Sequence, residues 1–176
     1  MDIYGEKIRL RALEERDNEM LRVLMNDPET EKMVFGTSWP VSESGQRQWL
    51  ANLKNDPRML RCAVEDVESG EAVGTLILSD IDHKNGTAEL HIKLTGAARG
   101  KGIGTDCVKT IVRYAFRELR LNCVYANILG YNEASLKLFE KCGFVREGIL
   151  RSRIFKGGRF VDVCVCSILA QDMSTL

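Results

Sequence analysis

The sequence predicts a mixed α/β (α+β) fold in which helices pack on a central sheet. Segments of alternating apolar and polar residues, typical of strands, recur along the chain. They are separated by segments whose apolar residues recur with the helical period. The length agrees, because 176 residues, 44% of them hydrophobic, can build one core. We therefore expect one domain over residues 1–176, with about seven mostly antiparallel strands and about four helices.

The expected order along the chain is strand, two helices, three strands, helix, strand, helix and two strands. The alternating segments place the strands at residues 8–13, 59–65, 72–78, 87–94, 123–129, 144–150 and 160–169. The periodic segments place the helices from Glu14 to Asp27-Pro28, from the cap Ser42 to Asp56-Pro57, from Ile103 to Phe116 and from Asn132 to Cys142. Residues 29–41 show no clear period and are either a loop or a broken helix. Residues 151–159 are expected to connect the last two strands through a turn at Gly157-Gly158.

Composition favours an intracellular protein without a structural metal. Lys and Arg number 25, as do Asp and Glu, so the formal net charge of zero does not point to any particular class of partner. The six cysteines include no C-x-x-C pair and have no histidine cluster near them, which disfavours zinc. The N-terminal residues lack a signal-peptide pattern, and no apolar run reaches membrane length. We therefore expect a soluble, cytoplasmic protein that does not associate with membranes.

A glycine-rich turn between the strand at 87–94 and the helix at 103–116 carries the clearest functional signal. It reads Arg99-Gly100-Lys101-Gly102-Ile103-Gly104. The first N–H groups of a helix have no partner within the helix and lie at the positive end of its dipole. The turn is therefore suited to a phosphate or pyrophosphate. An ordinary strand-to-helix turn is the alternative.

The spacing of the glycines separates this turn from two other phosphate-binding loops. A Walker loop requires glycine where the chain has Thr95, and a dinucleotide-binding loop requires glycine where it has Thr105. The pattern Arg/Gln-x-x-Gly-x-Gly/Ala is matched by Arg99, Gly102 and Gly104. In this pattern the chain resembles the GNAT superfamily of N-acetyltransferases, in which the loop holds the pyrophosphate of acetyl-CoA.

A second segment strengthens the resemblance. Residues 132–135 and 139–144 are similar to the N-x-x-S and Y-E-K-x-G-F sequences of the superfamily, and the order of elements agrees over nearly the whole chain. Residues 147–151 and 155–162 resemble the RimJ/RimL-like branch, which includes acetyltransferases of ribosomal-protein N-termini and lies close to spermidine acetyltransferases. The resemblance implies a GNAT-like sheet splayed between its fourth and fifth strands. It also implies acetyl-CoA as co-substrate, without a metal.

The resemblance further implies which residues bind the coenzyme. Main-chain N–H groups of the fourth strand would receive the pantetheine and the acetyl carbonyl, and the glycine-rich turn would receive the pyrophosphate. The expected coenzyme-binding residues are Ile92, Lys93, Leu94, Arg99, Gly100, Lys101, Gly102, Ile103, Gly104, Thr105, Asn127, Asn132, Ser135 and Phe139. Asn132 is also suited to cap its own helix.

Acetyl transfer needs a neutral amine, and Glu89 is the first candidate for the base that takes its proton. It lies in the fourth strand, where several GNAT enzymes carry a glutamate, and the two-residue period places His91 on the same face. Both could instead be solvated surface residues. The resemblance would put a proton-donating tyrosine where the chain has Phe139. Ser135 and, more weakly, Tyr131 are the substitutes, although free CoA is a leaving group that can do without an acid.

The acceptor is an amine that the sequence does not identify. The resemblance puts its groove among the first two helices and the last two strands, near Phe35, Trp39, Trp49 and residues 151–160. Carboxylates that could attract a cationic amine are Glu31, Glu43, Asp80 and Asp82. We expect a primary amine, either a peptide or ribosomal-protein N-terminus or a small molecule such as spermidine, another polyamine or an amino sugar.

Two other functional classes remain open. Phe139 is compatible with a domain that binds acyl-CoA as a regulator without catalysis. Basic residues outnumber acidic ones between Arg99 and Arg159, which is compatible with a nucleic-acid or ribosome-surface binder. The second class is disfavoured because the sequence lacks basic residues interleaved with exposed aromatics. The resemblance also allows a homodimer.

Overall fold

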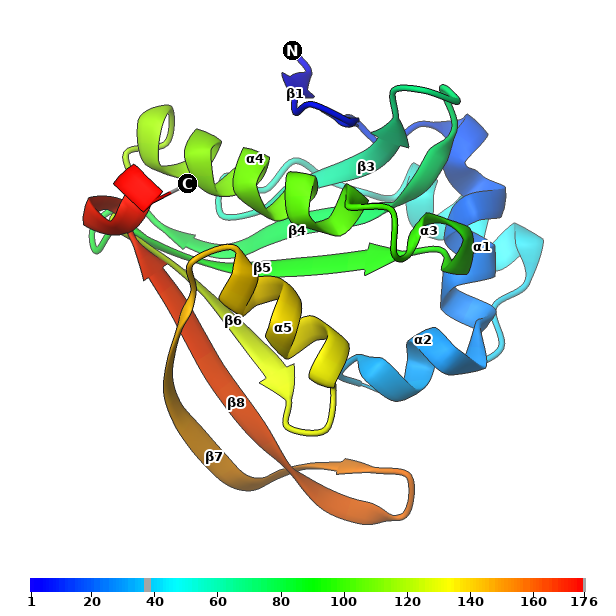
Figure 1. Cartoon of the computed structure of the whole chain (residues 1–176). Coiled ribbons are helices and arrows are strands. Elements are labelled where there is room, and N and C mark those ends of the chain that lie inside the picture. The colour runs from blue at the N-terminus through cyan, green and yellow to red at the C-terminus, as the bar shows by residue number, and fades with distance from the viewer. Residues whose placement is uncertain (37–38, 176) are drawn as a thin grey trace.

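One mixed sheet organises the computed structural model, which describes residues 1–36 and 39–175 (Figure 1). Its eight strands lie in the order β1-β2-β3-β4-β5-β6-β8-β7. Among the described strands, neighbours are antiparallel except for the parallel pair β5 and β6. The strands are β1 (Ile3–Tyr4), β2 (Ile8–Arg11), β3 (Leu60–Asp66), β4 (Ala72–Asp82), β5 (Thr87–Leu94), β6 (Cys123–Leu129), β7 (Val145–Lys156) and β8 (Arg159–Leu169).

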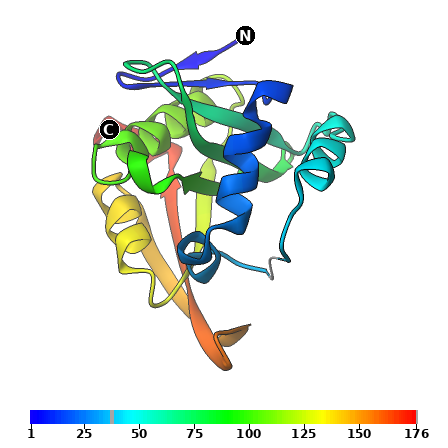
Figure 2. The same cartoon turned by 90° about the vertical axis from the view of Figure 1, so that its right-hand side faces the viewer.

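The helices cover both faces of this sheet. They are α1 (Asn18–Asn26), α2 (Pro28–Met33), α3 (Glu43–Ala51), α4 (Ile103–Arg117) and α5 (Glu133–Lys141). Figure 2 shows α4 and α5 on one side of the sheet and α1 and α3 on the other. The main hydrophobic core lies under α4 and α5, where buried apolar residues of the sheet meet Val108, Ile111 and Phe139. Because side chains alternate along a strand, the opposite face of each strand is available for polar groups.

The structure confirms the expected mixed α/β, GNAT-like fold and the order of its long elements. The Ser42 side chain accepts a hydrogen bond from the Gly45 N–H and begins α3, as expected of a cap. The two-residue strand β1 was not predicted, because it is too short to show a period. In the segment 29–41, expected as a loop or a broken helix, α2 covers the first residues, and residues 37 and 38 lie outside the described residues. Asp27 caps α2 through the N–H groups of Glu29 and Thr30.

The parallel pair β5 and β6 separates soon after it forms. Pairing covers Thr87 with Cys123, Ala88 with Val124 and Glu89 with Tyr125. The rest of β5 pairs with β4 alone, and the rest of β6 pairs with β8 alone. This is the splay expected between the fourth and fifth predicted strands. Main-chain groups of both strands that face the opening are therefore free for another hydrogen-bond partner.

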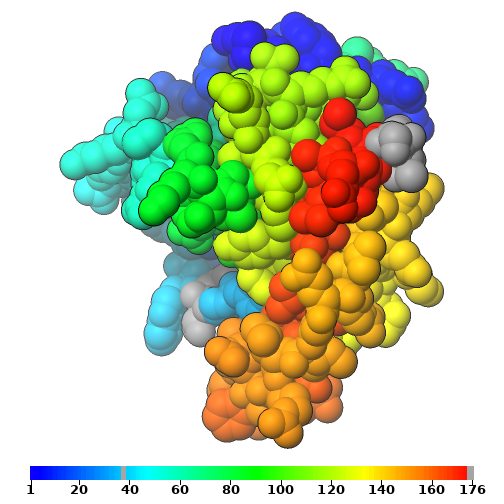
Figure 3. Space-filling view, turned by 90° about the vertical axis from the view of Figure 1, so that its left-hand side faces the viewer, coloured from blue at the N-terminus to red at the C-terminus, as the bar shows by residue number. Residues whose placement is uncertain are grey.

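The last two strands form a longer hairpin than expected. Residues 151–159, expected as a connection, belong mostly to β7 and β8, and only the Gly157-Gly158 turn lies between them. Strand β7 is an edge strand with side chains exposed on both faces and two register shifts, so it lacks the alternation that marks a strand in sequence. The hairpin extends beyond the rest of the molecule, and α2 lies beside it (Figures 1 and 3).

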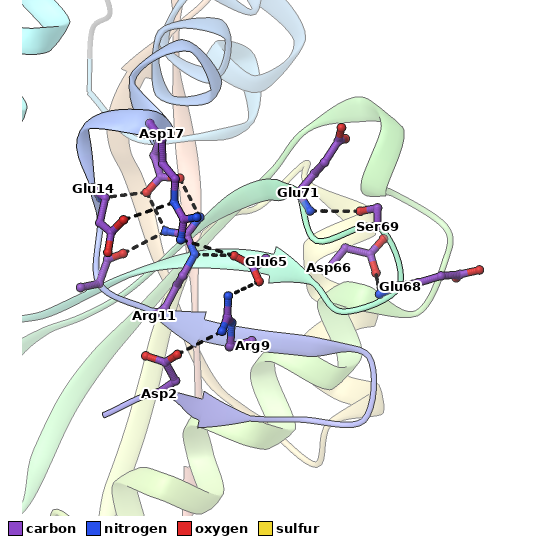
Figure 4. Close-up of polar contacts among 12 residues, drawn as sticks. Asp2, Arg9, Arg11, Glu14, Asp17, Glu65, Asp66, Glu68, Ser69 and Glu71 are labelled. Carbon is purple, nitrogen blue, oxygen red and sulfur yellow. Dashed lines mark hydrogen bonds and ion pairs between the residues drawn. The ribbon is translucent and has the colours of Figure 1, made fainter.

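A buried cluster of charges joins β2 and β3 to the start of α1 (Figure 4). The Arg11 guanidinium donates to both Asp17 carboxylate oxygens at 2.8 Å and to Glu65 at 2.5 Å. The side chains of Arg11, Asp17 and Glu65 are 6%, 1% and 7% exposed. Burial of Asp17 opposes its ionisation, but hydrogen bonds from Arg11 and from the Glu14 N–H outweigh this and lower its pKa. The cluster thus fixes where α1 leaves the sheet.

Replacing Asp17 by Asn should lower the free energy of unfolding by about 3 kcal/mol, because it leaves a buried cation without one of its partners. Chemical denaturation at pH 7 measures this. The folded-state pKa of Asp17 is lowered from its ordinary 3.8. Its stabilisation is therefore present above that value, and the difference between wild type and variant should shrink as pH falls below it.

The control is Glu19→Gln, which breaks an exposed ion pair with Arg22 on α1 and should change stability little. An equal loss in both variants would show that the buried cluster has no special role.

Candidate active site

The glycine-rich turn forms the N-terminus of α4. Gly100 and Gly102 have φ angles of 76° and 82°, a left-handed conformation that glycine adopts without strain. Gly102 is the residue before the first helical turn, and the first hydrogen bond of α4 runs from the Asp106 N–H to the Gly102 carbonyl at 3.1 Å. The N–H groups of Ile103, Gly104 and Thr105 precede that bond and are directed out of the helix end. This arrangement suits an anion.

The turn before β2 supports this loop from a distant part of the chain. The Asp106 side chain accepts hydrogen bonds from the N–H groups of Lys7 at 2.7 Å and Ile8 at 3.2 Å. The Lys7 ammonium donates to the Lys101 carbonyl at 3.0 Å and lies beside Gly102, where a Cβ would be 3.2 Å from it. Lys7 therefore adds a cation beside the glycine-rich turn. Sequence reasoning missed it, because no local pattern links residues 94 positions apart.

Arg99, which opens the glycine-rich motif, is directed away from the loop that follows it. Its guanidinium donates to the Thr30 hydroxyl at 2.9 Å and lies 3.8 Å from the Asp27 carboxylate. The exposed neighbours Gly100 and Lys101 complete the turn. The structure thus uses Arg99 to hold the start of α2 against the loop.

The end of β5 lies directly under α4. Ile92 and Leu94 pack against the hydrophobic core, and a Cβ on Gly104 would meet Leu94 and Leu138 at 3.4 Å. Gly104 thus allows α4 to approach both β5 and α5 closely. The main chain of residues 92–94 borders the opening between β5 and β6.

A polar cluster occupies the other face of the sheet at the point where β5 and β6 separate. The Asn127 side-chain amide donates to one Glu89 carboxylate oxygen at 2.8 Å, across the two strands. The other Glu89 oxygen lies 3.8 Å from His91 Nε2, which in turn lies 2.8 Å from the Ser79 hydroxyl. The Glu89 side chain is 15% exposed and the His91 side chain 37%. Glu89 and His91 share a face, as predicted, and Asn127 contacts Glu89.

Tyr125 belongs to the same face, and the negative charges on that face affect the pKa of its hydroxyl. Burial, and then the charges of Glu89 and Asp80, raise the pKa of its hydroxyl. Asp80 lies at a register shift of β4 and has a φ of 50°, which is unusual for a residue other than glycine. A bulge at this point directs its side chain differently from that of a regular strand residue.

The residues around the start of α5 have mainly structural contacts. The Asn132 side chain caps α5 by accepting from the Ser135 N–H at 3.1 Å and also donates to the Met33 carbonyl at 3.1 Å. The Tyr131 hydroxyl donates to the Lys32 carbonyl. Both therefore hold the end of α2. The Phe139 ring is 2% exposed and packs edge-on against Phe144 at 4.8 Å. The structure shows no side-chain contact between Ser135 and Glu89 in the described residues.

The four carboxylates considered for the acceptor groove divide into two pairs. Glu43 pairs with Arg47 along α3, and Asp82 accepts hydrogen bonds within its own turn, so both have local roles. Glu31 lies at the splayed end of the sheet and binds Lys156 at 2.5 Å, and Asp80 lies near Tyr125. Trp39 and Trp49 are 79% and 45% exposed.

A wide groove lies elsewhere in the described structure, between α3 and the start of β3. Its volume is about 960 Å³, and Leu50, Leu53, Met59 and Leu60 are among its lining residues. We assign the site to the β5–β6 opening instead, because the helix N-terminus, the unpaired strand edges and the polar cluster converge there. No group of three or more metal-ligating side chains occurs among the described residues.

A splayed sheet with a helix N-terminus at its opening is the arrangement expected of an acetyltransferase that binds acetyl-CoA. The chain belongs to the GNAT acetyltransferase family, since the family described as Acetyltransferase (GNAT) domain matches residues 7–145. It is 30% identical over 174 residues to the uncharacterized N-acetyltransferase p20 of Bacillus licheniformis, with 97% of each chain covered. It is 29% identical over 160 residues to the spermidine N(1)-acetyltransferase of Vibrio cholerae, covering 90% of this chain and 91% of that protein.

A solved structure agrees with these relatives. The spermidine N-acetyltransferase from Vibrio cholerae, in complex with CoA and spermine, superimposes with a TM-score of 0.86 at 27% identity. The match covers 97% of this chain and 99% of that one. The protein is therefore an N-acetyltransferase that takes its acetyl group from acetyl-CoA and transfers it to an amine. In the described residues, no helix is both long and apolar enough to span a membrane.

Replacing Gly102 by Glu should remove the thermal stabilisation that acetyl-CoA gives. The side chain would require a strained φ of 82° and would put a carboxylate beside Lys7, in the place proposed for the pyrophosphate. For the wild type, ligand at about 100 times its Kd should add about 2.7 kcal/mol, a measurable shift in Tm.

Gly70→Glu is the matched control, because Gly70 has a φ of 72° in the β3–β4 turn, with open space around it. It introduces the same side chain and a similar strain far from the loop. An undiminished acetyl-CoA shift in Gly102→Glu would remove the loop from the coenzyme site.

Proposed function

We propose that the protein acetylates a primary amine by direct attack in a ternary complex, with Glu89 as the general base. Acetyl-CoA supplies the acetyl group as a thioester, which the amine converts to an amide with release of CoA. The observation that carries the proposal is the position of Glu89, where β5 and β6 separate, held by Asn127 at 2.8 Å. The chain needs a base there because an ammonium ion has no lone pair for the attack.

The surroundings of Glu89 support this role. Its side chain is mostly buried, and only one of its two carboxylate oxygens accepts the Asn127 hydrogen bond. The other oxygen is the acceptor for the proton that the amine loses. His91 and the Ser79 hydroxyl, 2.8 Å apart, continue the polar path from Glu89 along the same face. Asn127 acts here as a positioning residue as well as an expected coenzyme contact.

We assign no essential acid to the leaving CoA thiolate. Phe139 has no proton to give, and the Tyr131 hydroxyl is already committed to the Lys32 carbonyl. Ser135 keeps a hydroxyl on the first turn of α5 and is the remaining candidate from the sequence. A CoA thiolate leaves readily enough for positioning of the two reactants to supply much of the rate.

Two acceptor classes have support. Residues 147–151 and 155–162 support a RimJ/RimL-like branch and hence a peptide or ribosomal-protein N-terminus. The relatives that acetylate spermidine support a small amine, such as a polyamine or an amino sugar. Lys156 binds both Glu31 and the Gly36 carbonyl and so joins the last hairpin to the segment around α2.

We also propose the number of domains, the oligomeric state and the cellular location of the protein. The single core under α4 and α5 supports one domain. The exposed apolar side chains Ile149, Phe155 and Phe160 on the β7–β8 hairpin support a homodimer. Free cysteines at all six positions support a cytoplasmic setting.

Replacing Glu89 by Gln should lower kcat by about a hundredfold to ten-thousandfold, because a general base is lost. Acetyl-CoA should stabilise the variant as it does the wild type, since Gln can still accept the Asn127 hydrogen bond. Thiol release from acetyl-CoA, measured over a panel of N-terminal peptides, polyamines and amino sugars, tests this.

Glu71→Gln, an exposed carboxylate in the β3–β4 turn, provides the comparison and should retain full activity. If Glu89→Gln keeps wild-type kcat across the pH range, another group takes the proton.

A further inference from the structure

Lys93 is a partly buried cation on the acceptor side of β5. Its neighbours Ile92 and Leu94 pack into the core under α4, so the alternation of the strand directs Lys93 to the opposite face. Glu89 and His91 occupy that face too. Lys93 lies beyond the last residue of β5 that pairs with β6, so its side chain belongs to the open part of the site.

The charge of Lys93 has no counter-ion in the described part of the chain. Neither a hydrogen bond nor an ion pair with another residue of 1–36 or 39–175 involves its ammonium. Burial, and then the nearby charge of Lys156, lower its pKa. Lys156 differs because it is neutralised by Glu31 and bound to the Gly36 carbonyl. A cation partly removed from water without a partner is costly, unless a ligand supplies the opposite charge.

The opposite end of the same face is acidic. Glu89 and Asp80 both act on Tyr125 electrostatically, and neither has a cationic partner other than His91 in the described structure. The acceptor side therefore has a charge gradient along β5, from carboxylates at one end to an ammonium at the other that has no counter-ion among residues 1–36 and 39–175. The Cα atoms of Glu89 and Lys93 are about 13 Å apart, at about 3.3 Å for each strand residue.

From this gradient we infer that the acceptor is a small primary amine that also carries an anionic group, a carboxylate, phosphonate or phosphate, several bonds from the nitrogen. The inference rests on the proposed function. The amine lies at Glu89, and the anion pairs with Lys93. A polyamine would instead bring a second cation toward Lys93, and like charges that meet in a partly desolvated site disfavour binding. Lys93 is thus a specificity-determining residue.

The test uses acceptors that differ only at the end distant from the amine. They are 6-aminohexanoate, 6-aminohexanamide and 1,6-diaminohexane, together with the corresponding four-carbon set. Thiol release by the full chain should give a kcat/KM that is highest for the carboxylate, about tenfold or more lower for the amide, and lowest for the diamine. This order in the wild type tests the inference without any variant.

Lys93→Met should remove the preference by lowering kcat/KM for the carboxylate about tenfold and raising it for the diamine. Lys93→Arg keeps the charge and should keep the order of the acceptors. Lys84→Met, an exposed lysine in the turn between β4 and β5, should change nothing. The KM for acetyl-CoA should be unchanged in all three variants.

The outcomes separate the inference from the proposed function. Turnover with a preference for the diamine or the amide would overturn the inference and leave the proposed function intact. A uniform loss in Lys93→Met for all acceptors, with a raised KM for acetyl-CoA, would assign Lys93 to the coenzyme and also overturn the inference. Absence of turnover with every acceptor, including peptides and polyamines, would overturn both.

Discussion

The separation of β5 from β6 determines where the site lies and how the neighbouring elements are held. Two neighbouring strands that stop pairing leave main-chain N–H and C=O groups without partners in the middle of a sheet, and such groups are costly when buried. This cost is limited to the facing edges of the two strands, because β5 pairs with β4 and β6 pairs with β8 on their other edges. At the vertex, the Asn127–Glu89 hydrogen bond joins the two strands through side chains. What remains open is an edge that only a ligand or water can satisfy.

The opening stays in shape because distant segments are bonded across it. Helix α2 is held at its start by Arg99, at its end by Tyr131 and Asn132, and along its side by Lys156. These contacts come from the loop after β5, the turn after β6 and the last hairpin. Each bond to an exposed group contributes little by itself. Together they place α2 beside both diverging strands, so a change in the angle between β5 and β6 would break several of them at once.

The sequence predicted the parts of the structure that depend on local pattern. Alternation located β5 and β6, and residue type identified the caps Ser42 and Asn132, because these features involve residues only a few positions apart. The predicted strand at 144–150 was shorter than β7, because both faces of this edge strand are exposed and it therefore lacks apolar alternation. Polar contacts such as Arg99 with Thr30 join residues 69 positions apart. Periodicity shows which face of an element is buried, but it carries no information about which polar group meets which, and the roles of Arg99, Tyr131 and Lys7 came from the fold alone.

In the proposed reaction, the main chain and the side chains of strand β5 would serve different reactants. Its main-chain edge and the helix that follows it would bind the coenzyme, and they depend on glycine positions and strand pairing rather than on particular side chains. Its outward side chains, Glu89, His91 and Lys93, would bind the acceptor. Substitution on that face can therefore change the acceptor while the coenzyme site stays intact. Because the two reactants depend on different features, the class of reaction can be predicted from the sequence through the glycine-rich turn. The acceptor depends instead on where a few charges lie within a chain whose formal net charge is zero.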